Sequence, residues 1–208
     1  MIAFLFSPLS LASSEPLNGT FALRENLPIQ IRHPLGVAWA TADTVAEWLV
    51  LGQQDGETVT WTVQLCSLST PARFGAETVY PETLLRSVPS RVRVGQLTDG
   101  GVFFSGPLVE VLGEGDEDED GNPGVSITVR IPVGEGQVFV RQKATMTYRG
   151  ALSGEVLRGE VDYSAEQELF GATTWWLKVP VKQRPAGPGT FELHPIAGSS
   201  CADVAGVW

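Results

Sequence analysis

Carboxylates at every second position mark the stretch of the chain most suited to chemistry. Asp116, Asp118 and Asp120 alternate there, and Gly121 and Asn122 follow directly. Side chains that alternate in a tight loop can converge on one cation, and Ca²⁺ takes about six to eight oxygen ligands. The glycine permits a sharp turn, after which Asn122 offers its backbone carbonyl. We therefore predict a calcium ion held by Asp116, Asp118, Asp120 and Asn122.

The stretch Asp116–Gly121 resembles the first half of the calcium loops of EF-hand and dockerin proteins, D-x-[DN]-x-[DN]-G. The second half of that pattern is missing, because Ile127 stands where a bidentate glutamate is needed. The resemblance therefore implies weak binding, with a dissociation constant on the order of 10⁻⁴ to 10⁻³ M. Glu110 and Glu114 could add carboxylates. The alternative is a solvated hairpin tip whose charges repel one another.

The acidity of the chain is concentrated in and around this loop. The formal net charge is −10, and seven acidic residues lie between Glu110 and Asp120. This balance argues against a nucleic-acid partner. Residues 1–12 are apolar and end in Ser10-Leu11-Ala12, which is typical of a truncated signal peptide, with an ordinary first strand as the alternative. We predict a secreted, periplasmic or cell-surface protein without a transmembrane segment, with residues 13–208 forming one domain.

The chain contains two cysteines, Cys66 and Cys201. In an exported protein they are expected to form one disulfide that ties the C-terminal tail to the sheet. The alternative is a pair of buried free thiols.

Short alternating runs separated by Gly, Asn, Asp and Pro predict an all-β fold. In Glu57–Cys66, for example, Val59, Trp61 and Val63 alternate with threonines. We expect about nine to eleven strands in an antiparallel β-barrel that resembles the up-and-down barrels of lipocalins and other calycins, or else a β-sandwich. Exceptions to the strand pattern are Glu82–Arg86, predicted as a helical turn, and Ser164–Phe170, predicted as a helix. As a whole the chain is similar to secreted β-proteins of Gram-negative bacteria, a resemblance that implies no particular activity.

Six tryptophans are present, and their flat faces can stack on sugars or enclose an apolar ligand. We predict that Trp61, Trp175 and Trp176 contact a small apolar or carbohydrate ligand, with core packing as the alternative. Arginines recur on neighbouring predicted strands and could form a cationic stripe that holds an anion or pairs with Glu110, with a solvent-facing polar side of the sheet as the alternative. They are Arg91, Arg93, Arg130 and Arg141.

These observations favour an exported, non-catalytic domain that binds a small ligand or a partner surface, with the acidic loop as a calcium-stabilised hairpin between two strands. A carboxylate-based polysaccharide hydrolase is the first alternative, for which two pocket carboxylates roughly 5 to 10 Å apart are needed. Its candidates outside the loop are Glu47, Glu77, Glu110, Glu160 and Asp162. A structural envelope protein that assembles through sheet edges is the second. His33 and His194 each precede a proline, and neither belongs to a recognisable catalytic motif.

Overall fold

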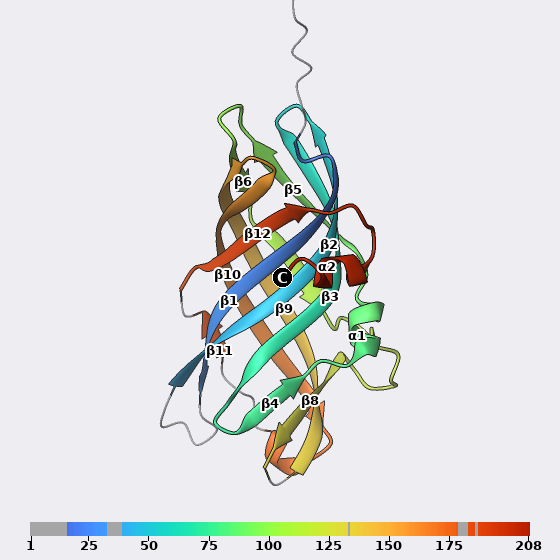
Figure 1. The fold of residues 1–208 in the computed structure, drawn as a ribbon. Helices are drawn as coiled ribbons and strands as arrows, with labels where there is room; N and C mark the ends of the chain where they lie inside the picture. Colours follow the sequence, from blue (N-terminus) through green and yellow to red (C-terminus); the bar gives the residue numbers. More distant parts are fainter. Residues whose placement is uncertain (1–15, 33–38, 133, 179–182, 186) are drawn as a thin grey trace, which may run out of the picture.

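The computed structural model describes residues 16–32, 39–132, 134–178, 183–185 and 187–208. The segment 1–12, where we predict a leader peptide, and His33 lie outside the described residues. The strands (Figure 1) are β1 (Gly19–Arg32), β2 (Trp39–Asp55), β3 (Thr58–Arg73), β4 (Ala76–Val79), β5 (Arg91–Leu97), β6 (Val102–Ser105), β7 (Leu108–Leu112), β8 (Val125–Ile131), β9 (Gly134–Ser153), β10 (Val156–Ala172), β11 (Gln183–Pro185) and β12 (Gly189–Pro195). The helices are α1 (Glu82–Ser87), the 3-10 helix η1 (Trp175–Leu177) and α2 (Cys201–Ala205). Among the described residues, no helix combines the length and the apolar character that crossing a bilayer requires.

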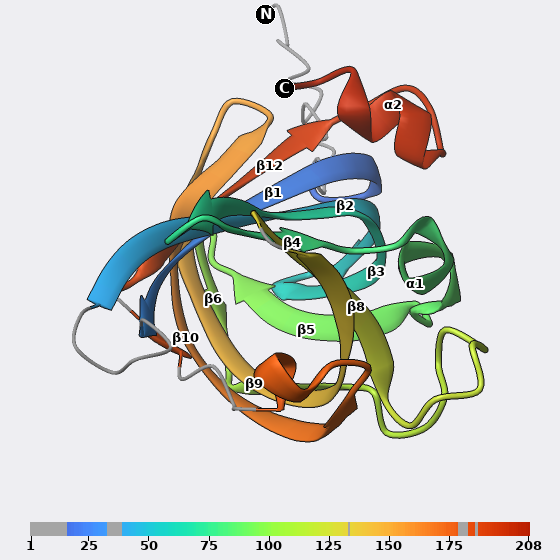
Figure 2. The same ribbon diagram turned by 90° about the horizontal axis from the view of Figure 1, so that it is seen from below.

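Eight of the strands pair in a closed circle, which we call the strand ring. In order around it lie β1, β2, β3, β5, β6, β9, β10 and β12, each antiparallel to the next, and β12 pairs with β1. Figure 2 shows the ring along its axis. Because the order in space repeats the order in the chain, the arrangement is up-and-down. The predicted all-β, antiparallel fold class is confirmed.

Strand β3 shows how the alternation builds the wall of the ring. Val59, Trp61 and Val63 are buried and point inward, and the threonines between them point outward. The turn from β2 to β3 is tight, since Asp55 pairs directly with Thr58. Gly56 has a φ of 58°, a conformation that a residue without Cβ adopts at little cost. The predicted hairpin is therefore present.

One end of the ring wall is built differently from the other. Strand β9 pairs in succession with β8, β7 and β6, and β3 pairs with β5 at its start and with β4 near its end. β4 and β8 pair with each other and complete the wall at that end. Among the described residues, β5 and β7 share no backbone pairing. We call the line between them the β5–β7 seam.

The helix predicted over Ser164–Phe170 is wrong, because this segment belongs to strand β10. Ser164 pairs with Thr145 and Leu169 with Val140, and a bulge at Phe170 precedes the end of the strand. The sixteen residue pairs that β10 makes with β9 outweigh the local spacing of Ala165, Leu169 and Phe170. The predicted turn at Glu82–Arg86 is confirmed as α1.

Large aromatic side chains fill the ring at the end where β5 and β6 lie. Trp61 stacks on Phe103 with ring centroids 4.7 Å apart, and Tyr148 meets Phe191 edge-on at 5.2 Å. A side chain at position 95 has no room, because a Cβ on Gly95 would lie 2.5 Å from the Phe103 ring. This half of the ring is therefore close-packed.

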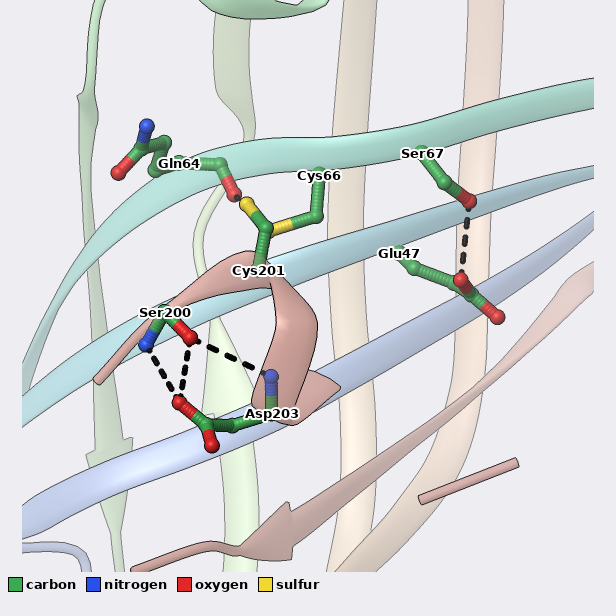
Figure 3. The surroundings of a disulfide bond; sticks show 7 residues. All are labelled: Glu47, Gln64, Cys66, Ser67, Ser200, Cys201 and Asp203. Carbon is green, nitrogen blue, oxygen red and sulfur yellow. Dashed lines mark hydrogen bonds between the residues drawn. A yellow bond between two sulfur atoms is a disulfide. The ribbon is translucent and has the colours of Figure 1, made fainter. Parts of the chain in front are cut away.

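The predicted disulfide joins Cys66 on β3 to Cys201 at the start of α2, as Figure 3 shows. Leu65 pairs with Trp48 and Ser67 with Glu47, so Cys66 is the extra residue of a β-bulge. Ser200 and Asp203 form a capping box that begins α2. The tail is thereby fastened to the outside of the ring.

Candidate functional site

A cavity of about 300 Å³ occupies the other half of the ring, where β4, β8 and η1 lie, and it is partly open to solvent beside the exposed lining residues Ala165 and Gln167. Its wall is mainly apolar, and typical members are Leu68, Ile127, Val129, Val138, Val140 and Leu169. This volume lies at the lower end of the range of about 300 to 1,000 Å³ found for small-molecule sites.

Small side chains at inward positions account for the cavity. Ala46, Ala144 and Ala165 line it, on β2, β9 and β10 respectively. At the filled end, the inward positions instead carry large side chains, such as Trp61 on β3 and Tyr148 on β9. The bulge at Cys66 also contributes. Before it, the odd-numbered residues of β3 up to Leu65 point inward, and after it the even-numbered residues from Leu68 do so.

Buried charges separate the cavity from the aromatic core. Arg93 donates to Glu25 over 2.7 Å and to Glu110 over 2.7 and 3.3 Å. Tyr148 donates to the same oxygen of Glu25 and accepts a bond of 2.9 Å from Arg93. The indole of Trp48 donates to the second oxygen of Glu25 over 2.9 Å, and its ring lies 4.5 Å from the guanidinium carbon of Arg93. We call these five residues the buried charge network.

The protonation of this network follows from its surroundings. Burial alone would lower the pKa of Arg93, but Tyr148, Glu25 and Glu110 together raise that pKa well above its ordinary value. Burial raises the pKa of Tyr148 well above its ordinary value, although the charge of Arg93 opposes this. Arg93 therefore stays charged and Tyr148 keeps its proton, so the phenol remains a hydrogen-bond donor.

The acidic loop lies outside the ring and is not a hairpin, contrary to our prediction. β7 and β8 pair with consecutive parts of the same strand, since Leu112 lies opposite Gln142 and Val125 opposite Val140. The loop thus leaves and rejoins the wall at nearly one point. Gly113 and Gly124 hold its ends there, because a Cβ on either would lie about 2.5 Å or less from the Val140 carbonyl oxygen.

Asp116, Asp118 and Asp120 do come together in this loop. One carboxylate oxygen from each lies within 4.8 Å of the others, so the cluster could hold a metal ion. Asp118 is only 7% exposed, and its Oδ2 accepts a bond of 2.8 Å from the Ser126 amide, whereas its Oδ1 has no partner in the described residues. Burial raises the pKa of Asp118, with smaller contributions from Asp120 and Asp116.

Three of the four oxygens of Asp116 and Asp120 already bond within the loop. Asp116 accepts bonds from the amides of Asp120 and Gly121, and Asp120 accepts one from the amide of Asn122. Glu114 pairs with Arg141 on β9, and Glu110 points into the ring. Within the cluster, Asp118 is the member whose unpartnered oxygen is buried.

The three predicted ligand-contacting tryptophans lie in different places. Trp61 is 1% exposed in the aromatic core, outside the cavity lining. Trp175 and Trp176 lie on η1, where Trp175 is 82% exposed and their neighbour Leu177 lines the cavity. Trp48 is the tryptophan that lines the cavity among the side chains that the structure describes. Ligand contact by Trp61, Trp175 and Trp176 stays a prediction.

The predicted arginine stripe does not exist as one face. Arg91 and Arg93 point into the ring, whereas Arg130 pairs with Glu135 on the surface and Arg141 with Glu114. The alternation within β5 could have indicated this, although the sequence analysis did not use it. Because Leu97 points inward, every second residue before it, namely Gly95, Arg93 and Arg91, is expected on the same face. The expected pairing of this set with Glu110 is found for Arg93.

Among the five carboxylates that we proposed for catalysis, Glu110 alone lines the cavity. Its companion there is Glu25, which the sequence analysis missed. Glu47 bonds Ser67, and Glu77 lies near Arg130 on the surface. Glu160 and Asp162 are exposed on β10.

Comparison of the chain with protein-family models, with curated proteins and with solved structures finds no match.

Proposed function

We propose that this protein is a non-catalytic binding domain whose cavity encloses a small, mostly apolar molecule. The observation that carries the proposal is the contrast between the two halves of the ring. Aromatic side chains fill one half, whereas inward alanines leave about 300 Å³ open in the other. Interiors are normally packed without large voids, so a retained apolar cavity favours an occupant.

Binding is favoured over hydrolysis by the state of the two cavity carboxylates. Both oxygens of Glu25 accept hydrogen bonds, and both oxygens of Glu110 accept from Arg93. A general acid or nucleophile needs an oxygen that is free to reach the substrate. The same contacts instead stabilise the inner end of the cavity.

Filling the cavity tests the proposal. The native protein is expected to enhance the fluorescence of the neutral apolar probe N-phenyl-1-naphthylamine, and Ala144→Phe is expected to abolish the enhancement. Ala151→Phe, on the outer face of the same strand, is the matched control and should bind like the native protein. Equal binding by both variants, each shown to be folded by circular dichroism, would place the probe elsewhere and refute the proposal.

We infer further that the acidic loop binds calcium. Support comes from Asp118, whose buried Oδ1 lies beside two other carboxylates and lacks a partner among the residues that the structure describes. Ca²⁺ accepts such oxygen ligands and offsets their mutual repulsion. Calorimetric titration is expected to show one weak site that Asp118→Asn removes. Glu119→Gln takes a negative charge from the same loop outside the cluster, and it should leave the site intact.

The disulfide supports a location outside the reducing cytosol, as proposed for an exported protein. Mass spectrometry of the natural protein without reductant tests this, since two free thiols would contradict it.

A further inference from the structure

We propose that the ligand is an amphiphile with an anionic head group, a carboxylate or a phosphate, which Arg91 binds in the cavity wall. The inference rests on the proposed function, since it names the class of molecule that the cavity takes. It starts from the hydrogen-bonding groups that the wall leaves unused.

Arg91 opens β5 and lines the cavity as a half-buried side chain. Its Nη2 donates to the backbone carbonyl of Val111 over 2.6 Å. No carboxylate of the described residues lies within salt-bridge distance of it, although a guanidinium has five N–H donors. A cation in an apolar wall is costly without a counter-charge, so a bound anion would stabilise it.

Arg93, which points inward from the same strand two residues later, differs from Arg91 in its partners. Its donors are engaged by Glu25, Glu110 and Tyr148, and these bonds occupy both carboxylates of the cavity lining. Arg73, the other arginine of the lining, bonds the backbone carbonyls of Thr41 and Ala72 and has no carboxylate partner in the described part of the chain. Arg91 and Arg73 are therefore the cations of the described lining without a carboxylate partner. Two nitrogens of Arg73 already donate to carbonyls, whereas one nitrogen of Arg91 does.

Two neutral groups of the wall are also unused. Gln142 on β9 and Gln167 on β10 face each other across the strand pair and line the cavity. Their amides have no hydrogen-bond partner among the described residues. Gln142 also lies opposite Leu112, the neighbour of the Val111 that holds Arg91. An anionic head would thus find N–H donors on both sides of β7, and its hydrocarbon chain would lie along the aliphatic wall.

Chain-matched amphiphiles test the head group. Decanoate, decyl phosphate, decanol and decylamine compete with N-phenyl-1-naphthylamine for the native protein at about pH 8. At least one of the two anions is expected to bind roughly tenfold more tightly than decanol, because charge-assisted hydrogen bonds are added to the same apolar burial. Decylamine is expected to bind more weakly than decanol. The tighter anion shows whether a carboxylate or a phosphate is preferred.

Variants then locate the head. Arg91→Gln should reduce anion binding to the level of decanol and leave decanol unchanged, while Arg73→Gln should keep the preference. Arg91→Lys keeps the charge without the planar fork and should keep part of the preference. This variant also serves if Arg91→Gln does not fold.

The outcomes separate the two proposals. Equal binding of decanol and both anions, or loss of the preference in Arg73→Gln alone, overturns the role of Arg91 and leaves the cavity function standing. Failure of every amphiphile and of the probe itself overturns the proposed function.

Discussion

At the scale of single residues, Glu25 is the most heavily used side chain of the interior. It is 1% exposed and accepts bonds from Arg93, Tyr148 and Trp48, which come from three different strands. A buried ion pair contributes little net stability when compared with apolar packing, but removal of one partner leaves a charge without compensation. The network therefore fixes the relative positions of β1, β2, β5 and β9.

Glu25→Gln is expected to lower the free energy of unfolding by about 2 to 3 kcal/mol, because charge-assisted hydrogen bonds are lost while Glu110 still pairs with Arg93. The amide keeps one acceptor oxygen but replaces the other with an NH2 group, so Trp48 or the pair Arg93 and Tyr148 meets a donor where an acceptor is required. Urea denaturation measures the loss. Glu82→Gln, which removes an ion pair with Arg86 on the surface of α1, should change stability by less than about 0.5 kcal/mol. Similar losses in both variants would contradict the role given to the network.

The three tyrosines make stability depend on alkaline pH. Burial raises the pKa of Tyr80 and Tyr148, and burial together with the charge of Asp43 raises the pKa of Tyr163 to about 12. The unfolded chain releases these protons near the ordinary pKa of 10.0, so it binds fewer protons than the folded chain above that pH. Stability is fully present below that pH and falls as the pH rises from there towards 12.

Phenolate absorbance is therefore expected to stay flat in the native protein as the pH passes 10.0. It should then rise together with the loss of the circular dichroism signal. A native-state titration of one or more tyrosines near their ordinary pKa would show that these phenols are not shielded.

At the scale of elements, local patterns predict the strands but not their environment. The two-residue period of β3 and β8 is a local property, and both strands are found. In β5 the two-residue period shows which residues share a face, but not which face is buried. If the more hydrophobic face is assumed to be buried, Val92 and Val94 are placed inside. The structure leaves these valines 66% and 49% exposed and buries Arg93, because the buried partners Glu25 and Glu110 come from elsewhere in the chain.

The acidic loop shows the same limit. Its aspartates could be recognised from their spacing, and the structure brings them together. Its hairpin geometry could not be judged locally, because the partner of both β7 and β8 is the twenty-residue strand β9 that follows them. Likewise the helical spacing near Leu169 carried no information about pairing with β9.

The disulfide is the element-scale feature with the clearest energetic consequence. It links residues 135 positions apart, so it restricts a large part of the unfolded chain. Cys201→Ser is expected to reduce stability by about 5 kcal/mol in the chain-entropy account. Guanidinium denaturation of the native protein with and without reductant measures the same quantity. Coincident curves would show that α2 and the bond are dispensable.

At the scale of the whole molecule, the ring is a packed end joined to a hollow end. The order of strands followed from short Gly turns in the sequence and was predictable. The cavity was not, because it depends on the summed sizes of inward side chains from several strands, including Ala46, Ala144 and Ala165. Neither Trp48 nor Arg91 could be assigned to it before the strands were placed.

A ligand that binds only the folded ring should stabilise all of it. At a free concentration about ten times the dissociation constant, N-phenyl-1-naphthylamine is expected to add about 1.4 kcal/mol and to raise the melting temperature by roughly 3 to 6 °C. Differential scanning calorimetry measures the shift. The same addition should leave Ala144→Phe unchanged, and an equal shift there would indicate binding at another surface.

The β5–β7 seam bears on how a guest reaches the interior. Arg91 bonds the Val111 carbonyl and Arg93 bonds Glu110, and these side chains bridge the two strands where a backbone ladder is missing. A head group that binds Arg91 competes with the Val111 carbonyl for the same N–H donors. It therefore weakens the Arg91–Val111 contact, one of the two side-chain contacts across the seam. Entry of a ligand between β5 and β7 then requires only these two side-chain contacts to break. Separating two paired strands would instead break a whole row of backbone hydrogen bonds.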